Sequence, residues 1–155
     1  MALKPGDPAP TFELPDEDGT SRSLTDLLAQ GPVVLFFYPA AMTSGCTAES
    51  CHFRDLGAEF GKVGAQRVGI SADAVEKQKQ FATENSFDYP LLSDADGTVA
   101  EAYGVKRRFP KSLPVKRVTF VIGTDGVIKD VVSSEFKMAV HADKALAALG
   151  GTAAS

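Results

Sequence analysis

The sequence predicts an α/β fold with a central mixed β-sheet flanked by helices. From residue 30 onward, apolar runs alternate with segments of helical periodicity, an order typical of parallel strands joined by right-handed crossovers. In the last third, two apolar runs flank the turn sequence at residues 123–126, which predicts a hairpin. We therefore expect one domain over residues 1–155, with a sheet that is parallel in its first half and antiparallel in its second.

The first core strand is expected at residues 33–38, which are continuously apolar and rich in β-branched and aromatic side chains. A helix should follow, because four apolar residues recur at helical spacing: Phe53, Leu56, Phe60 and Val63. The second strand is expected at residues 67–71. The apolar character of residues 33–38 indicates a strand covered on both faces.

The next helix should open at Asp73, because Glu76 three residues later completes the pattern of a capping box. This helix is expected to run to about Glu84. A short apolar stretch at residues 89–92, an Asp-Ala-Asp-Gly turn and a brief helix ending at Gly104 follow.

The two ends of the chain add elements to this core. Strands are expected at residues 117–122 and 127–132, followed by a helix at 141–149 that a Gly-Gly pair stops. Residues 12–14 and the turn at 16–19 indicate an added N-terminal β-hairpin. The small residues at 150–155 predict a frayed, flexible tail.

Composition argues against several function classes. Sixteen Lys and Arg against twenty Asp and Glu leave a net charge of −4, which argues against a general nucleic-acid binder. No apolar run approaches the roughly 18 residues of a membrane-spanning helix. The first residues lack the apolar segment of a signal peptide. We therefore expect no membrane association and a cytoplasmic location.

The two cysteines, Cys46 and Cys51, need an explanation other than folding, because a domain of this length can bury a sufficient core without a disulfide. Thr43 is a good N-cap candidate, which places Cys46 in the first turn of its helix. A thiolate there faces free backbone N–H groups and the positive end of the helix dipole. A metal site is not expected, because Cys46, Cys51 and His52 lack a fourth ligand and zinc spacing.

The spacing of the pair limits its chemistry. Five helical residues put the two Cα atoms about 8.7 Å apart, with side chains roughly 140° apart around the axis. A disulfide needs Cα atoms closer than about 7 Å. The helix can therefore hold two thiols, and a disulfide between them requires at least one helical turn to unwind.

Residues 36–55, with Pro39, Thr43 and Cys46 after an apolar strand, resemble the active-site segment of peroxiredoxins. The position of Cys51 is similar to that in the Q-type, or bacterioferritin-comigratory-protein, branch. Residues 6–10, 103–105 and 117–122 extend the resemblance over most of the chain. The resemblance implies a thioredoxin-like fold and an atypical 2-Cys thiol peroxidase without a cofactor, reducing hydrogen peroxide and organic hydroperoxides.

The resemblance also implies a role for each matching residue. Cys46 would be the peroxidatic cysteine, which becomes a sulfenic acid, and Cys51 the resolving cysteine, which forms an intramolecular disulfide with it. Thioredoxin or a similar dithiol reductant would restore both thiols. The protein would act as a monomer or weak homodimer.

The remaining four residues would lie around the Cys46 sulfur. Thr43 would donate its hydroxyl to the peroxide, and Pro39 would shield the thiolate from water. Arg117 would hold the thiolate and the peroxide together, with Glu49 orienting the guanidinium. A hydrogen bond to a charged group is worth about 1.5–3 kcal/mol. These donors could therefore stabilise the transition state and supply the rate that ionisation of the thiol alone does not.

The sequence departs from the family pattern in two places. Ser44 replaces the usual proline, which predicts a looser helix start. Ala40 and Ala41 replace residues that are commonly polar, which predicts a more apolar pocket rim and a preference for organic hydroperoxides.

Two other functions remain open from the residues. One is a disulfide reductase on the same fold, and the other is a redox-responsive binding module or chaperone whose helix unwinds on oxidation. The basic stretch at residues 106–117 is either a solvated loop or a positive surface that docks an acidic reductase. His52 and His141 are expected at the surface.

Overall fold

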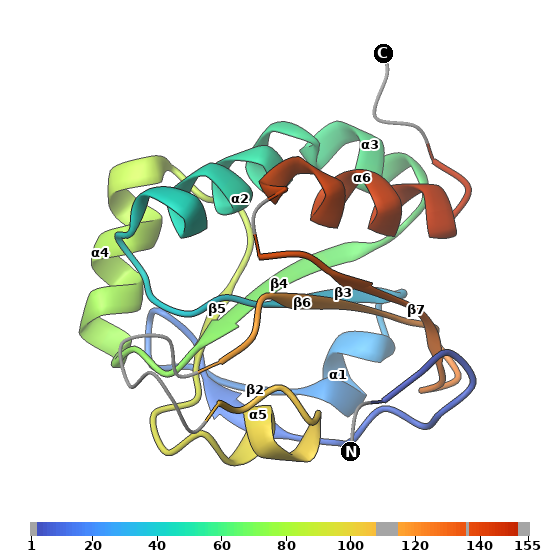
Figure 1. The fold of residues 1–155 in the computed structure, drawn as a ribbon, viewed down its shortest axis with the longest axis horizontal. Helices are drawn as coiled ribbons and strands as arrows, with labels where there is room; N and C mark the ends of the chain where they lie inside the picture. The colour runs from blue at the N-terminus through green and yellow to red at the C-terminus, as the bar shows by residue number, and fades with distance from the viewer. Residues whose placement is uncertain (1–2, 108–114, 136, 152–155) are drawn as a thin grey trace.

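The computed structural model describes residues 3–107, 115–135 and 137–151. A five-stranded sheet forms its centre, in the order β5-β4-β3-β6-β7 (Figure 1). The strands are β3 (Val33–Phe37), β4 (Gln66–Ser71), β5 (Leu91–Ser93), β6 (Val118–Ile122) and β7 (Ile128–Ser133). β3 pairs in parallel with β4, and β4 with β5, whereas the β3–β6 and β6–β7 pairs are antiparallel. The predicted mixed sheet is confirmed.

β3 is fully buried because helices cover both faces of the sheet. Val34 and Phe36 point to the side where α2 (Ser44–Asp55), α3 (Gly57–Lys62) and α6 (Met138–Ala148) pack (Figure 1). Val33, Leu35 and Phe37 join a second cluster on the other face, with α1 (Leu24–Leu28) and α5 (Thr98–Ala102). This alternation follows from the period of two of a strand. α4 (Val75–Asn85) contributes Phe81 and Ala82 to the first cluster.

The predicted N-terminal hairpin is present. β1 (Glu13–Pro15) pairs antiparallel with β2 (Ser21–Ser23). Between them, the buried Asp16 carboxylate accepts bonds from the backbone N–H groups of Asp18 and Thr20 and from the Arg22 guanidinium. The hairpin turn is therefore held by one side chain.

Three helix predictions need correction. The helix expected after the Thr43 N-cap, with its apolar residues from Phe53 to Val63, breaks at Leu56, where ψ is 17°, and so forms α2 and α3. α6 begins at Met138, three residues before the predicted start at His141, and its buried face begins at His141. The capping box at Asp73 is absent, and α4 begins after Ala74 without a side-chain cap. The Asp73 carboxylate instead binds groups of the loop and strand beside it.

Gly150 adopts a φ of +83°, which ends α6 as predicted, and most of the expected flexible tail lies outside the described residues. Within the residues that the structure describes, no helix has both the length and the apolar character required to cross a membrane.

Candidate active site

The loop that follows β3 positions the start of α2. Met42 in this loop has a φ of +71°, a left-handed conformation that is unusual for a residue with a Cβ. The backbone N–H of Ala41 donates to Asp73 at 2.7 Å, and the Ser71 hydroxyl donates to the same carboxylate oxygen. These bonds fix the loop against the end of β4.

Cys46 lies in the first turn of α2 and is fully buried. The first helical bond in the turn is donated by the N–H of Thr47 to the carbonyl of Thr43, at 2.8 Å. The N–H groups of residues 44–46 therefore have no intrahelical acceptor and belong to the positive end of the helix. The predicted position of Cys46 is confirmed.

Thr43 occupies the N-cap position, but its hydroxyl does not cap the helix. Thr43 Oγ1 donates to the carbonyl of Ala40 at 2.8 Å and is exposed. Thr43 is therefore the N-cap residue by position, as predicted, but its hydroxyl is turned toward the loop carbonyl and accepts no bond from the first helical turn. Pro39 is buried where the chain leaves β3.

Arg117 bridges Glu49 and Cys46 of α2. Its Nη1 donates to Glu49 Oε1 at 2.8 Å, and its Nη2 lies 3.4 Å from Cys46 Sγ. The Arg117 side chain is only 7% exposed, just before the first residue of β6. Burial would lower the pKa of Arg117, but Glu49 and Cys46 raise it above its ordinary value. The structure thus brings Arg117 to two residues of α2 that lie far from it in the sequence.

Glu49 is fully buried, one turn after Cys46. Burial raises the pKa of Glu49 to about 8, although Arg117 acts in the opposite direction. Among the residues that the structure describes, its Oε2 has no hydrogen-bond partner, and it lies 3.5 Å from Nδ1 of His141.

The prediction that His141 lies at the surface is wrong. The imidazole is fully buried, with Nδ1 2.8 Å from Thr119 Oγ1 and Nε2 2.8 Å from the Ser134 carbonyl. The signal was in the sequence, because His141 falls four residues before Ala145, on the apolar face of α6. His52 is partly exposed and pairs with Asp143 at 2.7 Å.

Cys51 is partly buried on α2, and its Sγ lies 3.7 Å from Asn85 Oδ1 of α4. Both cysteines are free thiols on one continuous helix. This arrangement agrees with the spacing argument, which excludes a disulfide while the helix is intact.

The apolar rim differs from the predicted one. Ala41 is 2% exposed and belongs to the core, so it is not part of a rim, whereas Ala40 is half-buried. Met42 is 37% exposed and supplies the apolar surface next to Thr43. Met138 of α6 lies close to Gly45 in the first turn of α2. A Cβ placed on Gly45 would be 3.6 Å from the methyl carbon of Met138.

The basic stretch is only partly described. Arg107 pairs with Glu135 at 3.0 Å, and Lys106 lies 3.9 Å from Glu101. Arg108 and Lys111 lie outside the described residues. The docking role of residues 106–117 stays a prediction.

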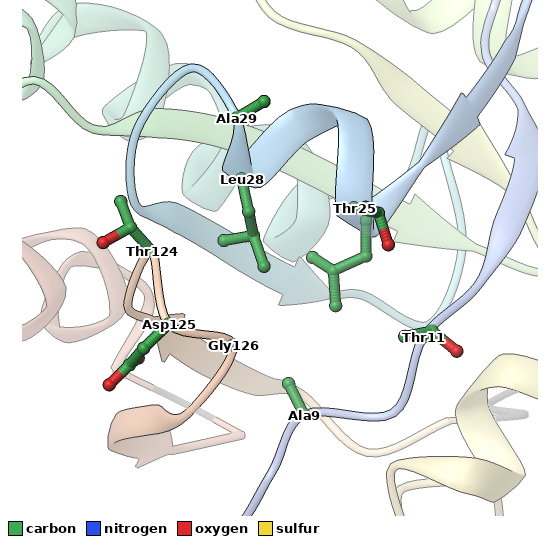
Figure 2. A pocket seen from close by; sticks show the side chains of 9 residues that line it. Ala9, Thr11, Thr25, Leu28, Ala29, Thr124, Asp125 and Gly126 are labelled. Carbon is green, nitrogen blue, oxygen red and sulfur yellow. The ribbon is translucent and has the colours of Figure 1, made fainter.

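A depression of about 340 Å³ lies away from this site, between α1 and the β6–β7 turn (Figure 2). Its lining includes Ala9 and Leu24 of the cluster on the other face of the sheet. Cys46 belongs to the cluster on the opposite face. The depression therefore takes no part in the site.

A family model described as the AhpC/TSA family matches residues 5–131. The chain belongs to the AhpC/TSA family of peroxiredoxins. Peroxiredoxin Bcp of Escherichia coli strain K12 is 43% identical over 148 residues, which cover 93% of this chain and 94% of that protein.

Solved structures of peroxiredoxins share the fold. Peroxidoxin BcpB from Mycobacterium tuberculosis matches with a TM-score of 0.92 and 63% identity, covering 96% of this chain and 97% of the other. Peroxiredoxin Q of Xanthomonas campestris matches with a TM-score of 0.82 and 32% identity, covering 97% and 96%. The predicted thioredoxin-like peroxiredoxin fold and the Q-type resemblance are confirmed.

Membership of the peroxiredoxin family supports a thiol peroxidase, which implies peroxide substrates and a thiol reductant. The role of each residue does not follow from membership alone. Those roles depend on the geometry of Cys46, Arg117 and Cys51.

Proposed function

We propose that this peroxiredoxin is an atypical 2-Cys peroxidase with Cys46 as peroxidatic and Cys51 as resolving cysteine. The observation that carries the proposal is the 3.4 Å approach of Arg117 Nη2 to the Cys46 sulfur in a buried site at a helix start. A cation and free backbone N–H groups around a thiol favour the thiolate, which is the nucleophilic form.

In the first step, the Cys46 thiolate attacks one oxygen of a hydroperoxide. An S–O bond forms and the O–O bond breaks, so that the sulfur is oxidised to a sulfenic acid and the leaving oxygen takes up a proton as alcohol or water. Negative charge moves from sulfur to the leaving oxygen. Arg117 and the N–H groups of the first helical turn stabilise that charge throughout.

In the second step, the Cys51 sulfur attacks the sulfenic sulfur of Cys46. The S–S bond forms, the S–O bond breaks, and the hydroxyl leaves as water. Because both residues lie on α2, the helix unwinds between them in this step. A dithiol such as thioredoxin then reduces the disulfide by exchange, which restores α2. One chain supplies both thiols, so catalysis as a monomer or weak homodimer is possible.

Thr43 and Pro39 complete the site. The Thr43 hydroxyl, now bonded to the Ala40 carbonyl, is exposed one turn before Cys46 and can rotate to donate to an incoming peroxide. Pro39 covers the end of β3 and limits water near the sulfur. Glu49 holds the Arg117 guanidinium through the 2.8 Å bond to Nη1.

Organic hydroperoxides are proposed as substrates beside hydrogen peroxide. The exposed Met42 side chain offers an apolar contact for an alkyl group next to Thr43. A bacterioferritin comigratory protein of Xanthomonas campestris, 31% identical with a TM-score of 0.82, is described by its alkyl peroxide reduction activity.

The test is peroxide reduction coupled to thioredoxin, in wild type, Cys46→Ser and Cys51→Ser. We expect no activity from Cys46→Ser, and a single turnover from Cys51→Ser with a sulfenic acid that dimedone traps. Normal cycling of Cys51→Ser with thioredoxin would remove the resolving role. Insulin reduction without peroxide turnover would instead indicate a disulfide reductase.

A further inference from the structure

The buried imidazole of His141 lies next to Glu49, the residue that accepts a bond from Arg117. His141 of α6 contacts Thr119 of β6 through Nδ1 and the Ser134 carbonyl through Nε2. A carbonyl oxygen only accepts, so Nε2 must carry the proton. In the neutral ring Nδ1 is then an acceptor, and the Thr119 hydroxyl donates to it.

The neutral ring explains the unpartnered oxygen of Glu49. Within the described part of the chain, Glu49 Oε2 is buried without a hydrogen-bond donor and lies 3.5 Å from Nδ1 of His141. In the neutral ring Nδ1 carries no proton and already accepts from Thr119, so it gives Glu49 no donor, and an ionised carboxylate oxygen buried without a donor is strongly disfavoured. A protonated Oε2 carries no charge and so is disfavoured far less in this place, while Oε1 still accepts from Arg117.

The charges around Glu49 favour the same state. Arg117 is the cation of this buried cluster, and both Cys46 and Glu49 can form an anion beside it. Glu135 adds negative charge from the segment between β7 and α6, although Arg107 pairs with it. Tyr89 is buried nearby with its hydroxyl on the Ser50 carbonyl. One cation compensates one anion, so ionisation of Glu49 opposes the Cys46 thiolate.

We propose that His141 is a positioning residue of the peroxidatic site, whose neutral ring keeps Glu49 protonated and so leaves the charge of Arg117 to the Cys46 sulfur. The inference rests on the proposed function of Cys46. Its proton balance is simple: a Cys46 thiol with an ionised Glu49 becomes a Cys46 thiolate with a protonated Glu49. No proton is gained or lost by the cluster.

The titration of both groups agrees with this assignment. Burial raises the pKa of Glu49 to about 8, against the effect of Arg117. Burial and Arg117 lower the pKa of His141, although the bond to Ser134 acts in the opposite direction. Both directions leave the pair uncharged at neutral pH.

The direct test is ¹⁵N NMR of the histidine rings in the reduced protein. The chain has two histidines, so a His52→Asn variant assigns the signals. We expect His141 to show a protonated Nε2 and an unprotonated Nδ1 from pH 7 to 8. An imidazolium at pH 7 would overturn the proposal, because it would pair with an ionised Glu49.

A kinetic test uses Glu49→Gln, whose amide copies the protonated carboxyl. The rate of Cys46 oxidation by peroxide is measured for both proteins at pH 7 and 9. With a Glu49 pKa of about 8, the ratio of variant to wild-type rate should rise about tenfold between these pH values. A constant ratio would contradict the proposal. If wild type consumes no peroxide, the proposed function fails, and the NMR result still decides the state of His141.

Discussion

The Asp73 carboxylate accepts a 2.7 Å hydrogen bond from the backbone N–H of Ala41, and so joins the end of β4 to the loop that carries the peroxide site. The same oxygen accepts from Ser71, whose hydroxyl also receives a bond from Gln78. Through Gln78 this group continues to the Tyr38 hydroxyl at the end of β3. Met42 adopts a left-handed conformation that glycine usually takes, and the bond from the neighbouring Ala41 N–H to this polar network holds the loop in place.

We expect Asp73→Ala to lower both activity and stability. The variant leaves the Ala41 N–H without its acceptor, which costs about 1–3 kcal/mol for a buried donor. The loop then positions Thr43 less well, and kcat/KM for peroxide should fall about tenfold. Chemical denaturation and steady-state kinetics measure the two effects. Asp73→Asn, which keeps an acceptor oxygen, is the matched control, and an equal loss in both variants would point to charge instead of loop position.

Tyr89→Phe should speed disulfide formation. The Tyr89 hydroxyl donates to the Ser50 carbonyl at 2.7 Å and anchors α2 beside Cys51. Removing it costs about 0.5–1.5 kcal/mol and makes local unwinding easier by a factor of up to about ten. Stopped-flow measurement of disulfide formation after a peroxide pulse gives the rate. Tyr103→Phe, which loses a bond to Pro10 on the other side of the sheet, controls for general loss of stability. Equal acceleration in both variants would exclude the anchoring role.

Met42→Asn should change the substrate preference. Asparagine tolerates the left-handed conformation, so the loop keeps its shape while the exposed apolar surface is lost. We expect the ratio of kcat/KM for cumene hydroperoxide over hydrogen peroxide to fall several-fold. An unchanged ratio would mean that alkyl groups do not contact Met42.

Glu49 should make folding stability depend on pH. Its folded pKa of about 8 lies above the ordinary carboxyl value of 4.5, so its contribution is fully present below pH 4.5 and is lost as pH rises through 8. The free energy of unfolding of wild type should therefore fall between these pH values. Glu49→Gln should show a flatter profile in urea titrations across the same window. A wild-type profile that rises over this range would contradict the burial of a protonated Glu49.

Three features could be predicted from the sequence: the core strands, the change from parallel to antiparallel pairing, and the position of Cys46 in the first turn of its helix. A continuous apolar run such as residues 33–38 indicates a strand buried on both faces. The alternation of strands with helices along the chain indicates parallel pairing. Cys46 and Cys51 were found because their spacing has a geometric consequence on any helix.

Side-chain partners across elements could not be predicted in the same way. Asp73 fits a capping box locally, but the tertiary structure offers it the Ala41 N–H. A surface position for His141 was expected because peroxide reduction needs no added base once the thiol is ionised, although its helical position places it on the apolar face. Its partners Thr119 and Ser134 lie on other segments, and nothing local in the sequence reports them.

The central claim is that Cys46 and Cys51 form a disulfide through unwinding of α2. The most direct measurement adds one equivalent of hydrogen peroxide to the reduced protein, maps disulfides by mass spectrometry, and follows hydrogen exchange of residues 44–55. We expect an intramolecular bond between Cys46 and Cys51, together with faster exchange over this segment than in the reduced protein. Oxidised protein without that bond, or with α2 exchange unchanged, would contradict the account.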